Sequence, residues 1–507
     1  MSVLPDPDPR PLDHLVFAGA DDAKALILRD RVLTYRDLRQ QVGRLAAWLQ
    51  AHVPDKGARV ASWAGKGELT CLLPLAAARA GLVHVPVNPL LKHAQVAHIL
   101  ADSAASLLIG NQGRLATLEA GDVPQGCVCR DEMQLRADLD ERIEELTLSN
   151  WKTNELCAIL YTSGSTGLPK GVMLSHANLW LGAVSVAHYL GLESDDVVLG
   201  VLPLSFDYGQ NQLLSAWRAG ACVVPLDYLT ARDVLKACAR HGVTTLAAVP
   251  PLWAQLTELE WPREAATPLR RLTNSGGALT VDMVKTLRGL FPQARLFPMY
   301  GLTEAFRSTY LDPALVDWHP TSMGKAIPFA EVLVIGEDGR ETVPGEEGEL
   351  VHCGPLVAQG YWRDPARTAE RFRPAPAQAR HGGMAVWSGD RVVRDEAGLL
   401  YFAGRRDAMI KVAGNRISPQ EIEEAALATG LCAEAVALGV PDERLGQAIH
   451  LVVRLKGEGV VAEDILKSLS KNLPNFMIPK VIDMRDALPL NPNGKIDRAA
   501  LAQEVSA

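Results

Sequence analysis

A run of glycines, hydroxyl residues and one lysine is the segment of this 507-residue chain with the clearest chemical character. It reads YTSGSTGLPK from Tyr161 to Lys170 and follows the apolar run from Leu156 to Leu160. An apolar run that ends in Gly, Ser and Thr predicts a buried strand that leads into a flexible loop. Glycines let backbone N–H groups turn toward an anion, hydroxyls add donors, and the lysine adds a mobile positive charge. The segment therefore predicts a loop that binds polyphosphate.

The spacing of this loop differs from that of the common phosphate loop. The common loop has the pattern G-x-x-x-x-G-K-[ST] and opens directly into a helix. Here Gly164 and Gly167 are three residues apart, and Pro169 and Lys170 follow. The pattern therefore disfavours a P-loop kinase or GTPase. A Gly/Ser surface linker is the structural alternative, and the apolar segments on both sides of the loop argue against it.

Other groups of residues that suit a nucleotide site follow along the chain. The run from Tyr300 to Glu304 reads YGLTE and comes directly after the strand-like segment from Leu296 to Met299, at a sheet edge of the kind where ligands bind. Glycines in the run from Ser275 to Ala278 permit a close approach of the backbone. Four more short motifs follow: SGD at 388–390, GRRD at 404–407, IKVAGNRI at 410–417 and PLNPNGKID at 489–497.

Together these motifs resemble those of the adenylate-forming superfamily, which includes acyl-CoA and aryl-CoA synthetases, adenylation domains of peptide synthetases and firefly-type luciferases. They occur in the same order along nearly the whole chain. The resemblance implies an AMP-forming acid–thiol ligase of the acyl-CoA synthetase type. In such a reaction a carboxylic acid attacks the α-phosphate of ATP and pyrophosphate leaves. The acyl group of the resulting acyl-adenylate is then transferred to the thiol of CoA.

Three alternatives are open beside this one. An amino-acid or acyl adenylase would load the phosphopantetheine of a separate acyl or peptidyl carrier protein instead of CoA. A luciferase-type oxygenase shares every motif and ranks low because such enzymes are rare. A non-catalytic nucleotide-binding or interaction protein is disfavoured, because loss of activity usually removes at least one reactive residue. All five are present here: Lys170, Glu304, Asp390, Arg405 and Lys495.

The resemblance also assigns the residues that bind ATP. The loop would wrap the β- and γ-phosphates, and Tyr300 would stack on adenine. Asp390 would accept hydrogen bonds from the ribose hydroxyls, and Arg405 would contact ribose or phosphate. The full expected set is Thr162, Ser163, Gly164, Ser165, Thr166, Gly167, Lys170, Gly276, Gly277, Ala278, Tyr300, Gly301, Asp390 and Arg405.

Three residues are expected at the reacting centre. By the same resemblance Thr303 would touch the α-phosphate and Glu304 would hold Mg²⁺, a cation that prefers carboxylate and phosphate oxygens. Lys495 lies in a loop rich in Asn, Pro and Gly, where a lysine is normally only solvated. Here it matches the family's catalytic lysine, whose long ammonium side chain can reach both the substrate carboxylate and the α-phosphate.

The second step is expected to use residues near the start of the C-terminal domain. Lys411, Gly414 and Arg416 belong to a segment that, in the superfamily, enters the site after adenylation when the small domain rotates. Asp407 would be the hinge of that rotation.

The acid substrate is expected to contact Phe206, Asp207 and Gly276. Amino-acid adenylating enzymes place Phe-Asp at this point, and their aspartate pairs with the substrate's ammonium group. An aspartate with only a structural role at the rim of the pocket is the equal alternative. The runs from Pro86 to Leu91 and from Leu473 to Pro479 instead resemble stand-alone bacterial acyl-CoA ligases, whose substrates are small carboxylic acids.

Composition and charge limit the other functions. The net charge of −8 argues against a nucleic-acid partner. No basic and apolar leader is visible at the N-terminus, and the apolar region from Leu69 to Leu91 is too interrupted by charge and proline to span a membrane. Eight scattered cysteines without a C-x-x-C pair predict reduced, buried thiols. A cytoplasmic enzyme without an integral membrane segment is expected.

Alternating strand-like and helix-like segments predict an α/β fold with mostly parallel sheets flanked by helices over residues 1–404. Residues 405–507 are expected to form a small, mobile α+β domain that carries the hinge and the catalytic lysine. Within it, Ser418 with Pro419 and Glu421 predicts a helix start with a capping box. Glu421 is accordingly interpreted as a capping residue and not as a catalyst.

Overall fold

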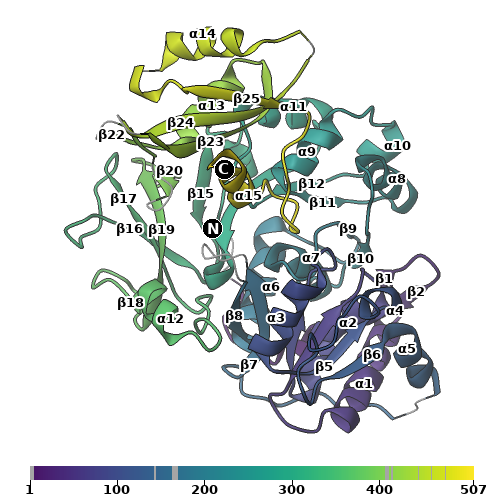
Figure 1. The fold of residues 1–507 in the computed structure, drawn as a ribbon. Coiled ribbons are helices and arrows are strands. Elements are labelled where there is room, and N and C mark those ends of the chain that lie inside the picture. The colour runs from purple at the N-terminus through teal and green to yellow at the C-terminus, as the bar shows by residue number, and fades with distance from the viewer. Residues whose placement is uncertain are drawn as a thin grey trace.

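The computed structural model describes residues 5–141, 144–162, 169–405, 410–412, 415–442, 445–457, 459–473 and 475–506. Figure 1 shows a large body built from the first four-fifths of the chain and a smaller C-terminal unit packed on one end of it. The predicted α/β class is confirmed. No helix among these residues combines the length and the apolar character that a bilayer crossing needs.

The first sheet of the large body carries the predicted phosphate loop at one edge. Its strand order is β6-β5-β3-β4-β7-β8, and only the β7–β8 pair is antiparallel. Because parallel strands need crossover connections, a helix follows each of β3, β4 and β5, whereas β7 leads directly into β8. The elements are α1 (Tyr35–His52), β3 (Arg59–Trp63), α2 (Glu68–Ala80), β4 (Val83–Pro86), α3 (His93–Ser103), β5 (Ala105–Gly110), α4 (Gln112–Leu115), β6 (Val128–Asp131), α5 (Glu132–Glu141), β7 (Leu156–Thr162) and β8 (Lys170–Ser175).

The second sheet begins with a parallel half, in which the strand order is β13-β12-β11-β9-β10-β1 and β2 pairs antiparallel with β1 at the edge. The register places Asn274, the last residue of β12, beside Pro298 in the middle of β13, two residues before Tyr300. The elements are β1 (Lys24–Ile27), β2 (Val32–Thr34), α6 (His176–Leu190), β9 (Val197–Gly200), α7 (Asp207–Arg218), β10 (Cys222–Pro225), α8 (Ala231–His241), β11 (Thr245–Ala248), α9 (Pro250–Thr257), α10 (Arg263–Ala266), β12 (Arg271–Asn274), α11 (Val281–Leu290) and β13 (Arg295–Leu302).

Beyond β13 the same sheet continues as antiparallel strands, which the sequence patterns did not separate from the parallel part. The order continues β13-β14-β15-β20-β19-β17-β16, and β18 pairs with β19. Short turns replace the crossover helices here, as antiparallel pairing allows. The elements are η2 (Thr303–Ala305), β14 (Phe306–Tyr310), β15 (Ser322–Ala326), β16 (Glu331–Ile335), β17 (Glu347–Cys353), α12 (Pro365–Arg371), β18 (Phe372–Pro374), β19 (Met384–Arg394) and β20 (Leu400–Arg405).

The C-terminal unit has a sheet and a hydrophobic core of its own. Its strands follow the order β22-β21-β24-β23, and β25 pairs with β24 in parallel. The buried carboxylate of Glu423 accepts hydrogen bonds from Ala437 N and from Arg498, which ties α13, β23 and α15 together. The elements are β21 (Ile410–Val412), β22 (Asn415–Ile417), α13 (Pro419–Ala428), β23 (Cys432–Asp442), β24 (Gly446–Leu455), α14 (Ala462–Asn472), β25 (Val481–Arg485) and α15 (Arg498–Ser506).

The predicted helix start at Ser418 is correct in position, but the capping box is wrong. Ser418 is the N-cap and Pro419 is the first helical residue. The Ser418 side chain makes no capping hydrogen bond, and its buried hydroxyl has no partner among the described residues. Glu421 is exposed. The helix start is therefore marked by Pro419, because a proline in the first helical position lacks the N–H group that would otherwise need a partner.

Helix α7 is buried along most of its length and begins at the predicted acid site. Gly209 lies in its first turn, and a Cβ atom there would lie 2.0 Å from the carbonyl oxygen of Pro203. The absence of a side chain thus lets the segment before the helix fold back against it. That segment carries Phe206, the N-cap of α7.

Gly209→Ala should therefore lower the free energy of unfolding by about 2–3 kcal/mol, because the new methyl group must displace backbone. The matched control is Gly289→Ala in α11, where a Cβ meets nothing within 4 Å. That change should stabilise the protein by about 0.5–1 kcal/mol through helix propensity. Chemical denaturation of both variants measures the difference, and equal stabilities would contradict the steric account.

Candidate nucleotide and acid site

The predicted phosphate loop connects two antiparallel strands. β7 ends at Thr162 and β8 begins at Lys170, and these two residues are paired across the hairpin. A hairpin loop differs from the strand-to-helix turn of a P-loop, in agreement with the sequence spacing. The Thr162 hydroxyl is buried without a partner among the described residues. Five predicted ATP-binding residues lie outside those residues: Ser163, Gly164, Ser165, Thr166 and Gly167.

Lys170 and Glu304, which are predicted to contact phosphate and Mg²⁺, form an ion pair. Lys170 Nζ lies 3.0 Å from Glu304 Oε1 and donates a hydrogen bond of 2.7 Å to the hydroxyl of Tyr361. That hydroxyl in turn donates to Glu304 Oε1 at 2.6 Å. One carboxylate oxygen thus joins β8, η2 and the segment before α12. Tyr361 could not be found from the sequence motifs because it belongs to none of them.

The electrostatics of this cluster keep Glu304 charged. Burial alone raises the pKa of Glu304, but the Lys170 ammonium and the Tyr361 hydroxyl outweigh it, so the pKa lies below the usual value. Burial and the neighbouring carboxylate raise the pKa of Tyr361, which keeps its hydroxyl protonated. Glu304 Oε2 accepts no hydrogen bond from a described residue. A buried, ionised carboxylate with one free oxygen fits a ligand of Mg²⁺.

The residues expected around adenosine also meet. Tyr300, on β13, donates a hydrogen bond from its hydroxyl to Asp390 Oδ2 on β19. Ser388 supports this strand: its hydroxyl accepts from Asp390 N at 3.0 Å and donates to Leu350 O at 2.5 Å. Asp390 is paired with Arg405 across the β19–β20 ladder. Strand register therefore places Arg405 opposite Asp390, and the hydroxyl of Tyr300 connects β13 to Asp390 by a hydrogen bond.

His352 is a second residue that the sequence motifs did not indicate. Its ring is stacked beside that of Tyr300 at 6.0 Å and 17°, and the side chain is 2% exposed. Burial lowers the pKa of His352 to about 3, so the imidazole is neutral at physiological pH. The neutral imidazole therefore packs beside the Tyr300 ring, nearly parallel to it, without adding a charge.

The catalytic-lysine loop of the small domain reaches into this site. Gly276 has a φ of 82°, a conformation that favours glycine. A Cβ atom at this position would also lie 2.4 Å from Lys495 Cε, so the absence of a side chain leaves room for the lysine. Lys495 Nζ lies 4.5 Å from the centre of the Phe206 ring. Asn274 Nδ2 holds the turn by donating to Gly277 O at 2.8 Å, while Ala278 is exposed.

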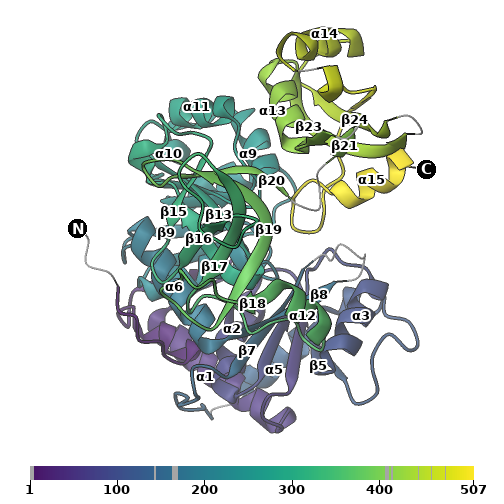
Figure 2. The ribbon, with the colours of Figure 1, turned by 90° about the vertical axis from the view of Figure 1, so that its left-hand side faces the viewer.

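Polar contacts hold the lysine loop against the large domain. Asn88 Nδ2 donates to Pro492 O at 2.7 Å and to Asn493 Oδ1 at 3.2 Å. Within the loop, Asn491 N donates to Lys495 O at 2.6 Å, which closes a small hairpin. Figure 2 shows this C-terminal loop extending from the small unit into the space beside the large body. Asn88 thus positions the loop that carries Lys495.

The predicted acid-binding residues lie at the start of α7. Phe206 precedes the helix, and Asp207 is its first residue and is partly exposed. The Tyr208 hydroxyl shares a 2.6 Å hydrogen bond with Thr273 Oγ1, which fixes the first turn on β12. Phe206 and Gly276 therefore lie next to Lys495, and Asp207 follows Phe206 in the chain, while Thr303 is buried in η2 beside Glu304.

The residues proposed for the second step are less defined. Asp407 and Gly414 lie outside the described residues. Lys411 and Arg416 are paired positions on β21 and β22, in the small domain. Their roles stay predictions. So does the boundary at 404/405: Arg405 ends β20 of the large sheet, and Ile410 begins the small sheet.

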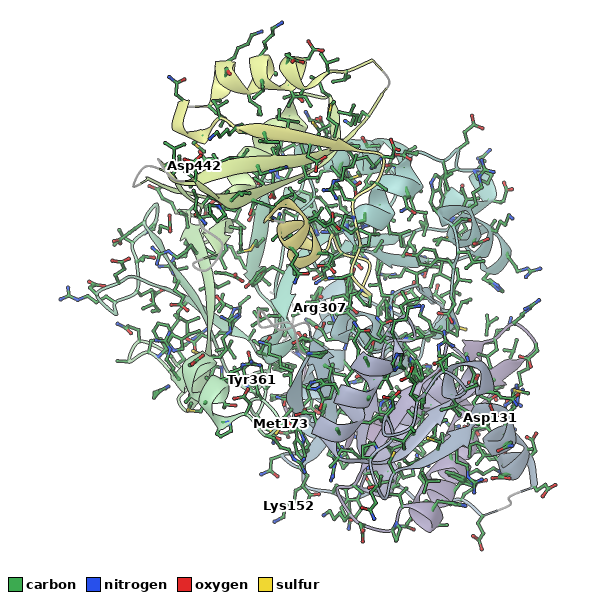
Figure 3. All side chains as sticks on the ribbon, viewed as in Figure 1. Asp131, Lys152, Met173, Arg307, Tyr361 and Asp442 are labelled. Carbon is green, nitrogen blue, oxygen red and sulfur yellow. The ribbon has the colours of Figure 1, made fainter. Side chains whose placement is uncertain are left out.

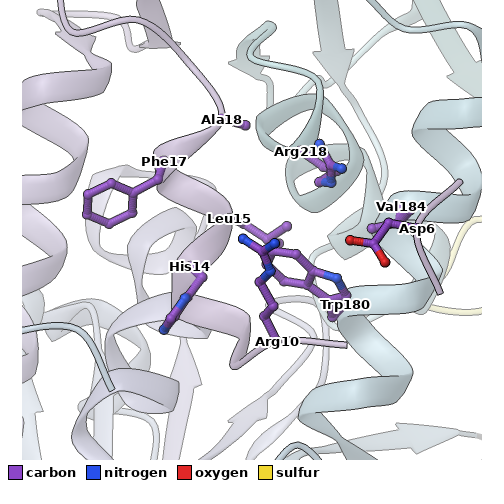
Figure 4. Close-up of a pocket in the computed structure, with 9 residues that line it drawn as sticks. All are labelled: Asp6, Arg10, His14, Leu15, Phe17, Ala18, Trp180, Val184 and Arg218. Atoms are coloured by element: carbon purple, nitrogen blue, oxygen red, sulfur yellow. The ribbon is translucent and has the colours of Figure 1, made fainter. Parts of the chain in front are cut away.

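A separate small cavity lies between the N-terminal segment, α6 and α7, on a different part of the molecule (Figure 4). Its volume is about 150 Å³, and none of the predicted site residues lines it. Its walls are Asp6, Arg10, His14, Leu15, Phe17, Ala18, Trp180, Val184 and Arg218.

The sequence matches the family description "AMP-binding enzyme" over residues 16–362 and "AMP-binding enzyme C-terminal domain" over residues 421–495. The first match alone covers more than half of the chain. The chain therefore belongs to the AMP-binding enzyme family, and the predicted class, an AMP-forming ligase that uses ATP, is confirmed.

The relatives of this chain include both a carrier-protein ligase and a CoA synthase. The chain is 31% identical to the L-proline–[L-prolyl-carrier protein] ligase of Pseudomonas fluorescens, over 95% of this chain and 96% of that protein. It is 32% identical to a feruloyl-CoA synthase of an Amycolatopsis species, over 92% of each chain. It spans only 6% of the length of malpinin synthetase of Mortierella alpina, to which it is 31% identical over 94% of this chain.

Among solved structures, the fold is similar to ATP-bound MatB from Rhodopseudomonas palustris. The TM-score is 0.88 at 26% identity, with 98% of this chain and 99% of that chain covered. The apo form of the same protein gives a TM-score of 0.78 over the same share of this chain and 99% of that chain. The present arrangement is thus more similar to the ATP-bound form.

Tyr361→Phe should lower kcat/KM for ATP about tenfold, because the bridge between Lys170 and Glu304 loses one charge-assisted hydrogen bond. Steady-state kinetics with varied ATP at saturating acid measures the effect. Tyr310→Phe is the matched control, since the Tyr310 hydroxyl has no hydrogen bond to a described residue and the Tyr310 ring, which the change keeps, stacks on that of Tyr189. If the two variants have the same kcat/KM, the bridge does not contribute to ATP use.

Proposed function

We propose that this protein activates a small carboxylic acid with ATP to an acyl-adenylate, releases pyrophosphate, and transfers the acyl group to CoA. The observation that carries the proposal is the position of Lys495. Its ammonium lies on Phe206 and beside Gly276, although it belongs to the small domain. A cation at this point can neutralise the carboxylate and the α-phosphate where both anions must approach.

The surrounding residues support the first step. Lys170 and the backbone of the loop from Thr162 to Lys170 would neutralise the leaving pyrophosphate. Tyr300 and Asp390 would orient adenosine, and Thr303 would contact the α-phosphate. Glu304 would hold Mg²⁺, which would neutralise charge on the polyphosphate when bound.

The acceptor of the second step is proposed to be CoA. The chain aligns with almost the full length of a CoA synthase, and it resembles stand-alone ligases at residues 86–91 and 473–479. The alternative acceptor is the phosphopantetheine of a carrier protein, and the proline–carrier ligase relative favours it. Lys411, Gly414 and Arg416 would serve either thiol after rotation about Asp407.

The reaction is tested by measuring pyrophosphate release across fatty, aromatic, dicarboxylic and amino acids, with and without CoA. Acid-dependent release of pyrophosphate is expected for at least one class, together with formation of an acyl-CoA. If an acid supports pyrophosphate release but CoA neither accelerates that release nor yields an acyl-CoA, the carrier-protein alternative is favoured. Release that no acid stimulates would overturn the proposal.

Lys495→Ala should reduce ATP–pyrophosphate exchange about 10²–10³-fold, because it removes the cation at the reacting centre. Thioester formation from a supplied acyl-adenylate should be largely spared, since that step uses the rotated domain. The control is Lys467→Ala, which removes an exposed lysine on α14 of the same domain. Equal loss of both steps in Lys495→Ala would refute the assignment of Lys495 to the first step.

Asp207→Asn distinguishes an amino-acid substrate from other acids. If Asp207 pairs with an ammonium group, kcat/KM for the amino acid should fall at least about tenfold, while its deaminated analogue is unaffected. Asp282→Asn, an exposed first-turn aspartate of α11, is the matched control. A variant with unchanged turnover of every accepted acid would leave Asp207 with a structural role only.

A further inference from the structure

A buried arginine that pairs with no carboxylate in the described part of the chain lies close to the proposed acid site. Three arginines are buried among the described residues whose exposure is defined: Arg79, Arg271 and Arg307. Arg79 pairs with Asp13 at 3.2 Å, and Arg271 pairs with Asp196 at 2.7 Å. Arg307 has no described carboxylate within ion-pair distance, and its buried Nε and Nη2 atoms have no hydrogen-bond partner there.

Such a cation is unfavourable in a protein interior unless something pairs with it. Arg307 is 2% exposed and is labelled near the middle of the molecule in Figure 3. Its guanidinium carbon lies 4.7 Å from the centre of the Tyr208 ring and 5.0 Å from that of Phe306. Contacts with aromatic faces offset part of the lost hydration but leave the N–H donors unused.

The surroundings place Arg307 at the acid site. It is paired with Gly301 across the β13–β14 hairpin, whose loop carries Glu304. The Tyr208 ring against Arg307 lies 6.1 Å from the Phe206 ring, and the Phe206 ring lies 4.5 Å from Lys495 Nζ. Arg307 and Lys495 thus each lie against one ring of the Phe206–Tyr208 pair.

Helix α7 adds further unpaired polar groups beside this row. Asn211 is 2% exposed, and neither its amide nitrogen nor its amide oxygen has a partner among the described residues. It follows Asp207 by four positions and Tyr208 by three, so it lies on their side of the helix. Gln210, 1% exposed, and the hydroxyl of Ser205 are also unpaired. Buried polar groups are normally hydrogen-bonded, so this concentration indicates a polar ligand.

We propose that the acid substrate is a dicarboxylic acid and that Arg307 binds its second carboxylate, an inference that rests on the proposed adenylation. The first carboxylate would lie at Lys495 for attack on ATP. The second would accept two hydrogen bonds from the planar guanidinium and one from the amide of Asn211. A monocarboxylic acid of the same length leaves the guanidinium and the amide unpaired, and this is the basis of its rejection.

The test compares kcat/KM for matched pairs of acids by pyrophosphate release: butanoate with succinate, pentanoate with glutarate, and hexanoate with adipate. The wild-type enzyme should prefer the diacid at least about a hundredfold in one pair. Arg307→Gln should reduce that ratio at least about tenfold, and Arg307→Lys, which keeps the charge but loses the fork, should retain more of it. The ratio within a pair does not depend on how much of a variant is folded.

The matched control is Arg271→Gln, which removes another buried guanidinium at a distance from this site. It should lower stability and leave the diacid preference unchanged. A thermal-shift measurement with each acid gives a binding readout that does not require turnover. The preferred diacid should raise Tm of the wild-type protein and not that of Arg307→Gln.

The outcomes separate the two proposals. If acids release pyrophosphate but the monoacid is turned over as well as the diacid in every pair, the diacid inference is wrong and adenylation stands. The same holds if Arg307→Gln keeps the wild-type ratio. If no acid releases pyrophosphate, adenylation is wrong, and a Tm shift by a diacid that depends on Arg307 would still show that the anion site exists.

Discussion

The ionised carboxylate of Glu304 is the constraint around which the site is arranged. A buried carboxylate without a cation would take up a proton, and Lys170 and Tyr361 prevent this by sharing the same oxygen. The contact connects the end of the phosphate-loop hairpin to the YGLTE segment and to the chain before α12. Because these segments are far apart in sequence, one charge fixes the relative positions of the phosphate, metal and adenosine subsites.

The lysine loop, which forms the second part of the proposed site, comes from the small domain and contacts the large domain through fewer and weaker interactions than those inside each domain. Asn88 and Gly276 contact the lysine loop by hydrogen bonds and by close packing at a glycine. Such contacts can be exchanged for water at small cost, unlike the apolar packing inside each domain. This difference suits a domain that brings Lys495 to the nucleotide in one step and gives way in the next, as mobile domains do in other enzymes.

The proposed acid site would select its substrate in two ways, by shape and by polar contacts. The aromatic residues Phe206 and Tyr208 provide shape; Lys495 lies against the Phe206 ring and Arg307 against the Tyr208 ring. Arg307 and Asn211 carry buried polar groups without a partner among the described residues, and the proposed second carboxylate would satisfy them. Asp207, at the partly exposed start of α7, has the opposite charge and is suited to a substrate group nearer to solvent. A site of this kind discriminates more by the cost of leaving groups unpaired than by the gain from contacts.

The fold class, the family and a proposed nucleotide site could be predicted from sequence, because loops such as 161–170 and 300–304 carry their chemistry within a few adjacent residues. The α/β class and the helix start at Pro419 were local signals of the same kind. Tyr361, His352, Asn88 and Arg307 were not predictable, since each lies beside the site only through strand register or domain packing. Ser418 shows the same limit: its position was correct, but its hydroxyl makes no cap. Sequence by itself determined the reaction class, because the residues that define it lie next to one another in short motifs. Tertiary structure alone decided which charges are paired, because the partner of a buried group comes from a distant segment.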